Sequence, residues 1–253
     1  MNIRWLDTID STNSEALRRL PELPHGTVIA ALEQTAGRGQ RGNTWFSEPG
    51  RNLTFSLVLK FGPEGLPPAS ALPPLAAADA VRLNYLASLT VARFLQDQGV
   101  GCTVKWPNDV YAGRRKICGI LIENALDGAF LASSVVGIGI NINQRDFPQL
   151  ANATSLRCLT GKEYSLEECL QQVLAHIEAL LPALHEGQRL FADYSALLFG
   201  RDVNARYHDL LTDREYTGVI QGVAPDGRLC IRDLDAPGQP LRYYRFKEVG
   251  FIL

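Results

Sequence analysis

The six residues 37–42, Gly-Arg-Gly-Gln-Arg-Gly, constrain the fold more than any other segment of the chain. They match the Gly-x-Gly-x-x-Gly pattern of dinucleotide-binding folds, in which the glycine turn opens a helix whose N-terminus meets a pyrophosphate. Here polar residues, Pro49 and then an expected strand at 53–59 follow the glycines. The sequence therefore argues against a Rossmann fold. It is not a P-loop either, because no Gly-Lys-Ser/Thr follows.

The same six residues are suited to binding an anion. Glycines let the backbone approach a ligand closely, and the guanidinium groups of Arg38 and Arg41 match the oxygens of a phosphate or carboxylate. Trp45 follows shortly afterwards. The alternative is a solvated surface turn. Two arginines alternating with three glycines favour an anion-binding loop.

The length and charge of the chain exclude several functional classes. With 253 residues, the chain can bury a large core in one domain or two. Its 25 Lys and Arg residues against 27 Asp and Glu residues give a net charge of −2, which argues against a protein that coats nucleic acid. The first residues do not form a signal peptide, and no uncharged apolar run is long enough to span a membrane.

The cysteines and histidines give no sign of a metal site. The five cysteines are scattered without a Cys-x-x-Cys pair, so neither a zinc site nor a disulfide framework is indicated, and a reducing cytoplasm is the expected location. The four histidines have no metal-binding spacing, and no Gly-x-Ser-x-Gly elbow is present. We therefore expect neither protein metal ligands nor covalent hydrolase chemistry.

The pattern of apolar residues predicts an α+β fold. Capping boxes precede two of the helices, Thr12 with Glu15 and Ser165 with Glu168. A proline-rich stretch at 62–74 is expected to be a surface loop. Helices are expected from about residue 11 and at 76–98 and 166–181, and strands at 27–32, 53–59, 102–106, 116–123 and 130–142.

The pattern changes after Gly200. Short alternating segments at 217–223, 228–231 and 241–246 are separated by turns, of which Asp226-Gly227 is a hairpin signal. These segments indicate a small all-β unit. We therefore expect two domains, at residues 1–197 and 198–253, both within the usual size range of domains.

Three further segments carry polar residues next to expected strands. At 105–109, Lys-Trp-Pro-Asn-Asp is either a plain turn or part of a site, and Asp109 could help to hold a magnesium ion. Lys116 either lies at a strand edge or points its charge into a pocket, while Gly119 allows close approach of a ligand or another backbone. Near Gly137 and Asn141, small residues alternate with branched ones, which tight sheet packing alone also explains.

Taken together, these segments resemble biotin–protein ligases. Each segment is weak evidence by itself, but five in the family's order, over about residues 8–143, are specific. The resemblance implies a mixed, largely antiparallel sheet like that of class II aminoacyl-tRNA synthetases, flanked by helices and followed by an SH3-like β-barrel. The matching segments are 10–13, 33–42 with Trp45, 105–109, 116–123 and 137–141.

The resemblance also implies a two-step reaction. Biotin and MgATP would form biotinyl-5′-AMP and pyrophosphate, and a lysine of the biotin carboxyl carrier protein would then take the biotin. Lys116, Arg38 and Asp109 would be catalytic. The biotin-binding residues would be Ser11, Thr12, Asn13, Gln34, Gly37, Arg38, Gly39, Lys116, Gly119 and Gly137. The ATP-binding residues would be Arg38, Arg41, Trp45, Asn108, Asp109, Lys116 and Asn141.

The sequence departs from the family pattern at several points. The family commonly has arginine where Gln40 and Asn43 stand, and Arg51 is a possible substitute. A basic C-terminal residue that some members use on the nucleotide has only Arg245 and Lys247 as candidates. A preceding winged helix-turn-helix does not fit before residue 11, so we expect no nucleic-acid partner and no membrane partner.

Two other functions stay open on the sequence. A lipoate or octanoate transferase would share the fold, although the glycine–arginine loop and the 105–109 segment are typical of the biotin branch. A non-catalytic ligand-binding or regulatory module is the third possibility. The resemblance allows a monomer or a homodimer.

Overall fold

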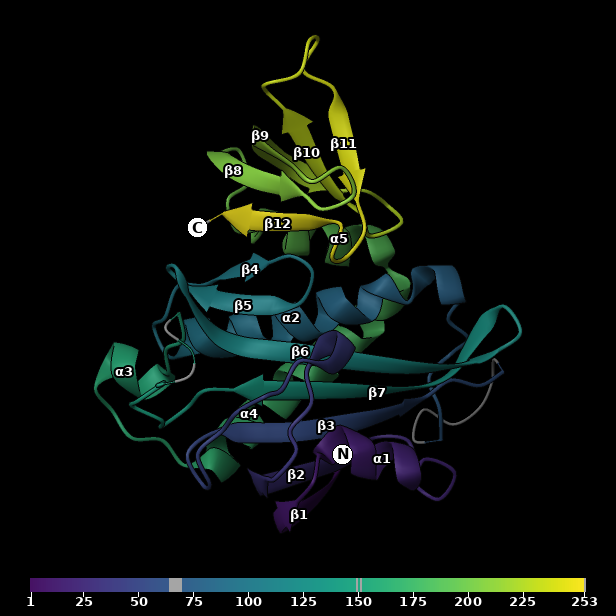
Figure 1. The fold of residues 1–253 in the computed structure, drawn as a ribbon. Helices are drawn as coiled ribbons and strands as arrows, with labels where there is room; N and C mark the ends of the chain where they lie inside the picture. Colours follow the sequence, from purple (N-terminus) through teal and green to yellow (C-terminus); the bar gives the residue numbers. More distant parts are fainter. Residues whose placement is uncertain (64–69, 149, 151, 253) are drawn as a thin grey trace.

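A computed structural model describes residues 1–63, 70–148, 150 and 152–252, with the side chain of Arg41 left out. It contains a seven-stranded sheet and a five-stranded sheet (Figure 1). The larger sheet is mixed, because β1 and β2 are parallel and its other neighbouring strands are antiparallel. In spatial order its strands are β1 (Asn2–Ile9), β2 (Thr27–Gln34), β3 (Leu53–Lys60), β7 (Phe130–Ile140), β6 (Arg115–Asp127), β5 (Asp109–Ala112) and β4 (Thr103–Lys105).

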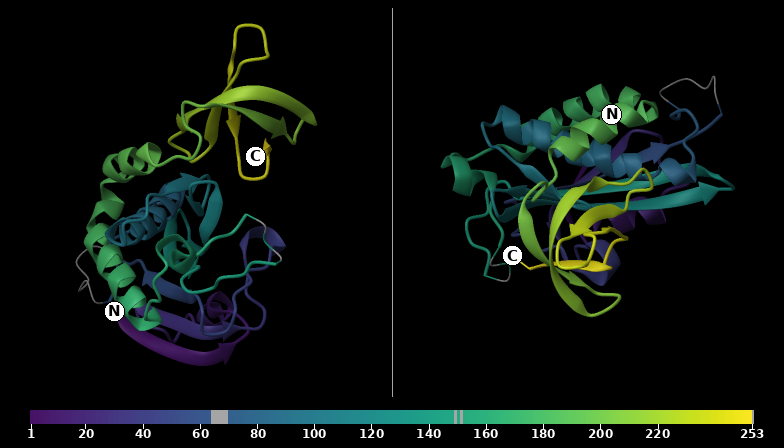
Figure 2. Two further views of the ribbon diagram at one scale, coloured as in Figure 1. Left: turned by 90° about the vertical axis from the view of Figure 1, so that its left-hand side faces the viewer. Right: turned by 90° about the horizontal axis from the view of Figure 1, so that it is seen from above.

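The smaller sheet is antiparallel and formed by the last part of the chain. Its strands stand above β4 and β5 in Figure 1, and Figure 2 shows the same separation from the side. In spatial order they are β11 (Leu241–Tyr244), β10 (Leu229–Asp233), β9 (Arg214–Val223), β8 (Asn204–Asp209) and β12 (Val249–Ile252).

Helices cover both faces of the larger sheet. The long helices α2 and α4 lie on one face and the short α1 on the other, as the view from above in Figure 2 shows. The helices are α1 (Thr12–Arg18), α2 (Val81–Asp97), α3 (Leu156–Thr160), α4 (Leu166–Leu180) and α5 (Gly187–Ala196), with 3-10 turns η1 (Gln40–Gly42), η2 (Ala77–Asp79) and η3 (Leu181–His185).

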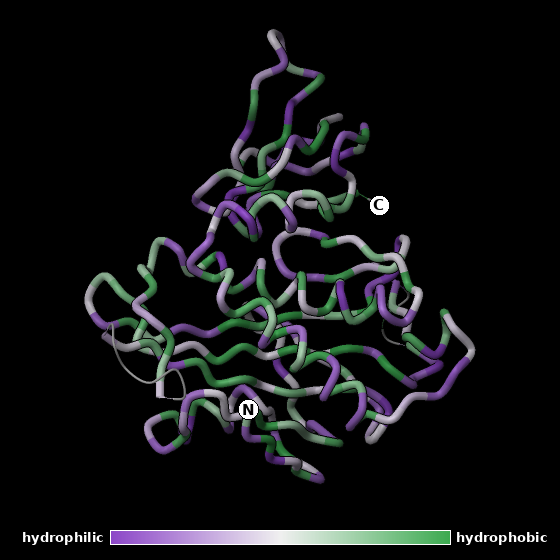
Figure 3. The backbone as a smooth tube through the Cα atoms, turned by 180° about the vertical axis from the view of Figure 1, so that it is seen from behind, coloured by the Kyte–Doolittle hydropathy of each residue, from purple (hydrophilic) through white to green (hydrophobic). Residues whose placement is uncertain are grey.

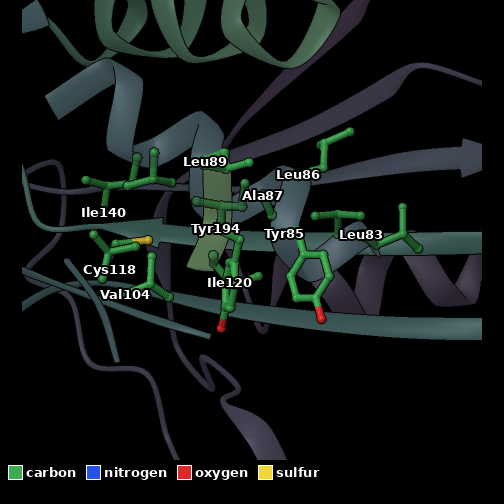
Figure 4. Close-up of a cluster of buried hydrophobic side chains, with 14 of the residues drawn as sticks. Leu83, Tyr85, Leu86, Ala87, Leu89, Val104, Cys118, Ile120, Ile140 and Tyr194 are labelled. Carbon is green, nitrogen blue, oxygen red and sulfur yellow. The ribbon is translucent and has the colours of Figure 1, made fainter. Parts of the chain in front are cut away.

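The strand β3 shows why both faces must be covered. Its side chains point alternately to opposite faces, and all of its first seven residues are buried. Phe55 and Leu57 pack in the larger core beneath α2 and α4, whereas Val58 packs with Ala16 of α1. Figure 3 shows hydrophobic segments following the central strands, and Figure 4 shows α2 side chains such as Leu86 packed against the sheet.

The expected mixed α+β fold is confirmed, with corrections at the helix starts. The first helix is capped by Ser11, whose hydroxyl accepts a hydrogen bond from the Ser14 amide, so the capping box of Thr12 with Glu15 is wrong. Ser165 is confirmed as the cap of α4. The second long helix begins at Val81 instead of residue 76, because a 3-10 turn precedes it.

Several elements were not expected from the sequence, namely β1, β5, β8, β12, α3 and α5. Part of the expected proline-rich loop, residues 64–69, lies outside the described residues. Within the described ranges, no helix is long and apolar enough to cross a membrane.

His25 gives the fold a testable pH dependence. It precedes β2, and its Nδ1 atom accepts a hydrogen bond from the Lys60 amide at 3.1 Å, which requires that nitrogen to be unprotonated. Burial, assisted by the charge of the N-terminal amine, lowers the pKa of His25. The unfolded chain therefore binds more protons, and stability is expected to fall as pH drops below the ordinary histidine pKa of about 6.5.

Thermal unfolding of the wild type and His25→Gln between pH 5 and pH 8 measures this contribution. The variant should lose less stability than the wild type on acidification, and His185→Gln, at an exposed position, serves as the control. Equal loss in the wild type and His25→Gln would contradict the assignment.

Candidate active site

A cavity of about 370 Å³ lies over β6 and β7, where α1, the glycine–arginine segment, the 105–109 turn and the last strands of the chain meet. Most of the residues singled out in the sequence line it, although they come from positions far apart in the chain. Those that line it are Ser11, Thr12, Asn13, Gln34, Arg38, Gly39, Trp45, Asn108, Asp109, Lys116, Gly119 and Gly137.

Two of the described residues in the expected set do not line this cavity. Gly37 lines a neighbouring hollow that shares Arg38 and Gly39 with it. Asn141 is buried beyond the cavity, where its amide donates a hydrogen bond to the Thr154 carbonyl at 3.0 Å. The side chain of Arg41 lies outside the described part of the chain.

One end of the cavity is a buried polar network around Thr12. Its backbone amide and hydroxyl both lie within hydrogen-bond distance of Oε1 of Gln34, at 2.7 and 3.1 Å. Ser56 of β3 lies 2.8 Å from the Thr12 hydroxyl and also bonds Oδ1 of Asn13. The amide of Asn13 in turn donates to the backbone of Leu121. These bonds fix the hydroxyl and amide groups before any ligand arrives.

Two glycines on neighbouring strands form a floor for Trp45. Gly119 of β6 and Gly139 of β7 are paired across the sheet. A Cβ atom at Gly139 would lie 2.5 Å from the indole ring, and one at Gly119 would lie 3.0 Å from it. The ring is therefore able to approach the backbone this closely only because both positions lack side chains. The space beside Gly137 is filled instead by Asn13.

Lys116 is the central charge of the cavity. Its ammonium lies 2.7 Å from Oδ1 of Asp109 and 5.9 Å from the centre of the Trp45 ring. Lys105 has a different environment, since its ammonium lies 5.3 Å from the Tyr111 ring and 5.0 Å from the Phe251 ring. Burial lowers the pKa of Lys105, and the nearby Asp109 carboxylate opposes that shift.

The 105–109 turn is held from three sides. The indole of Trp106 donates to the Gly227 carbonyl at 3.0 Å, and the hydroxyl of Tyr194 donates to the Pro107 carbonyl at 3.0 Å. The side-chain amide of Asn108 bonds the carbonyl of Ile120 on β6. Asn108 therefore secures the turn as well as lining the cavity.

Arg38 is paired with the carboxylate of Glu123, which was not predicted as a site residue. Its guanidinium binds Glu123 of β6 through two bonds, at 2.7 and 3.1 Å. The same carboxylate accepts a hydrogen bond from Asn13 at 3.0 Å. A charged residue within an otherwise apolar strand was the signal that could have marked Glu123 in the sequence.

The C-terminal sheet closes the remaining side of the cavity. Of the two basic candidates, Lys247 lines it, whereas Arg245 lines a separate hollow. Leu210 and Phe251 also face the cavity. No local pattern in the sequence pointed to these two residues, because their place depends on how the two sheets meet.

Comparison with known proteins identifies the family. The Biotin/lipoate A/B protein ligase family matches residues 5–141. The bifunctional ligase/repressor BirA of Escherichia coli (strain K12) is 38% identical over 237 residues, which cover 91% of this chain and 69% of that protein. The biotin–[acetyl-CoA-carboxylase] ligase of Paracoccus denitrificans is 37% identical over 245 residues, which cover 88% of this chain and 91% of that protein.

A solved structure agrees with these relatives. The biotin protein ligase from Aquifex aeolicus in complex with biotin and ATP has a TM-score of 0.75 and 26% identity, covering 98% of this chain and 97% of that one. The chain spans 52% and 46% of two Bacillus proteins of the BirA type. The chain therefore belongs to the biotin/lipoate A/B protein ligase family and, within it, to the biotin–protein ligases.

Proposed function

We propose that this chain is an ATP-dependent biotin–protein ligase whose acceptor is a lysine of a biotin carboxyl carrier domain. The observation that carries the proposal is that Lys116 lines the same cavity as the polar network around Thr12, with its ammonium 5.9 Å from the centre of the Trp45 ring. The network can hold a small polar ring system, the indole can stack on a base, and the ammonium faces the same cavity. Such an arrangement suits the joining of an acid to a nucleotide.

In the first step, an oxygen of the biotin carboxylate attacks the α-phosphorus of ATP. The bond from that phosphorus to the oxygen bridging to the β-phosphate breaks, and pyrophosphate leaves. Negative charge accumulates around the α-phosphate as this happens. Lys116 stabilises it there, because a fixed cation in a site with little water needs no reorganisation during the reaction.

In the second step, the uncharged amine of the acceptor lysine attacks the carbonyl carbon of biotinyl-5′-AMP. An amide bond forms, AMP leaves, and the amine loses a proton. Asp109, whose carboxylate is paired with Lys116, receives that proton in this scheme. Biotinyl-5′-AMP also reacts with water, so the glycine–arginine segment must shield it until the acceptor arrives.

Magnesium enters this scheme with ATP. Among the described residues that line the cavity, Asp109 is the sole carboxylate, and it is already paired with Lys116. Mg²⁺ commonly keeps water ligands and binds the phosphates of a nucleotide with only one or two carboxylates. The residues present therefore fit an ion held mainly by ATP, with Asp109 as its one protein neighbour.

The proposal also covers the division of the chain into domains. We assign residues 1–197 to a catalytic domain and residues 198–253 to an SH3-like barrel, supported by the confinement of the five-stranded sheet to β8–β12. We propose cytoplasmic location, and biotin, ATP and the carrier domain as partners, with no nucleic acid involved. The lipoate or octanoate alternative is less supported, because the Paracoccus denitrificans relative and the Aquifex aeolicus structure are named as biotin ligases.

Biotin-dependent exchange of labelled pyrophosphate into ATP tests the proposed function. The purified chain should catalyse exchange with biotin and should be inactive with lipoate or octanoate. Mass spectrometry of a carrier domain incubated with biotin and ATP should show one added biotinyl group. Exchange that needs lipoate would support the alternative, and no exchange with any acid would favour a binding module.

The pairing of Arg38 with Glu123 leads to a specific prediction. If Arg38 contacts the phosphates, ATP must draw its guanidinium away from Glu123. The Glu123→Gln variant should then lower the KM for ATP by about threefold, since a partly exposed ion pair of this kind contributes up to about 1 kcal/mol. The KM is measured in the exchange assay.

The control is Glu215→Gln, which removes the carboxylate of the exposed Arg206–Glu215 pair in the smaller sheet. A raised KM for ATP in Glu123→Gln alone would show that the pair holds the loop in its active position and that Arg38 does not move to the phosphates.

A further inference from the structure

The transfer step places a geometric requirement on the rim of the cavity. This inference rests on the proposed function, in which an acceptor lysine reaches the adenylate. An extended lysine side chain is about 6 Å long from Cα to Nζ, as five bonds allow. The backbone of the acceptor must therefore come close to the cavity, and its surface must touch the residues around the entrance.

The turn between β8 and β9 carries two exposed leucines, one of which lines the cavity. Leu210 lines the cavity and is 48% exposed, and its neighbour Leu211 is 68% exposed. Neither leucine belongs to the hydrophobic clusters formed within the described part of the chain. Exposed leucines side by side cost solubility and contribute nothing to this core, which is typical of a surface that meets a partner.

Hydrogen bonds hold this turn in one conformation. Oδ1 of the buried Asp209 accepts bonds from the amides of Leu211 and Thr212, at 3.0 and 3.2 Å. Its Oδ2 accepts a bond from the Tyr244 hydroxyl at 3.0 Å. The amide of Leu210 donates to the Glu248 carbonyl at 2.9 Å, which ties the turn to the loop before β12. A rigid apolar surface loses little conformational entropy on binding.

We propose that Leu210 and Leu211 form a docking surface for the acceptor domain. The occupant is a folded carrier domain with apolar side chains next to its acceptor lysine. Leu210 belongs to the wall of the cavity in which the lysine must react, and the more exposed Leu211 follows it on the same turn, so an acceptor that reaches this wall meets Leu211 beside it. The first step needs no such surface, since biotin and ATP bind inside.

The two half-reactions separate this docking role from catalysis. Leu211→Ser should leave biotin-dependent pyrophosphate exchange and transfer of biotin to hydroxylamine within about twofold of wild type. It should raise the KM for the apo carrier domain and lower kcat/KM by about tenfold, the effect of truncating one apolar contact of an interface. Leu211→Met keeps the apolar surface and should stay close to wild type.

The matched control is Leu126→Ser, which removes a 60% exposed leucine that does not line the cavity. An unchanged KM for the carrier domain in Leu211→Ser would overturn the proposal. Dissociation of a dimer in sedimentation, with an unchanged carrier KM, would overturn it in favour of contact between copies of this chain. Absence of exchange in the wild type would instead mean that the proposed function fails, so the two failures are distinct.

Discussion

Lys116→Ala is expected to lower the rate of adenylate formation by about 10²–10³, the usual cost of removing one fixed group that stabilises transition-state charge. Lys116 lines the cavity, and its ammonium is paired with Asp109 at 2.7 Å. Alanine would leave the developing phosphate charge without its fixed cation. Biotin-dependent pyrophosphate exchange at saturating biotin and ATP measures the loss.

A companion variant separates two causes of that loss. In Lys116→Ala, Asp109 loses its partner and its negative charge would repel the nucleotide. Adding Asp109→Asn removes this repulsion. Recovery to near wild-type exchange in the double variant would mean that Lys116 mainly neutralises Asp109. The exposed Lys162→Ala is the control for the loss of a positive charge elsewhere.

Trp45→Ala is expected to weaken ATP binding by about 1–3 kcal/mol, the range found for a base stacked on an aromatic side chain. This corresponds to a loss of about fivefold to 150-fold in affinity. The indole packs against Gly119 and Gly139, and the expected stacking would put adenine on the opposite face of the ring. Calorimetric titration with ATP in the absence of biotin measures the change without turnover, and unchanged affinity would refute stacking.

Gly139→Ala tests the floor beneath the same ring. The added Cβ would lie 2.5 Å from the indole, so Trp45 must shift although its side chain remains. The affinity for ATP should fall in the same direction as in Trp45→Ala. Trp45→Phe keeps an aromatic face and should retain part of the binding.

The parts of the fold that were predictable are those with a strong local pattern. The strand at 53–59 is a run of buried residues, and α4 follows a clear cap with apolar residues on one side. The edge strand β1 was not predictable, since it is half exposed along its length and lacks clean alternation. The four-residue β5 directly follows turn residues, which concealed it.

The candidate site was also predictable only in part. The resemblance supplied the residues near Ser11, Lys116 and the glycines, and the structure brings most of them to one cavity. Their individual roles remain predictions. Ser56 was missed although a serine inside a buried strand is a usable signal. Phe251 could not be predicted, because its contact with Lys105 depends on how the smaller sheet packs against β4 of the larger sheet.

The wall that β12 supplies to the cavity has a consequence for how the protein loses activity. This four-residue strand is at the edge of the smaller sheet and pairs there with β8 alone, so fewer hydrogen bonds hold it than hold a central strand. Detachment of β12 would expose Lys105 and one side of the cavity to solvent while the larger sheet stays folded. Heat or denaturant would then abolish activity by detaching β12 from the smaller sheet, before the rest of the structure unfolds.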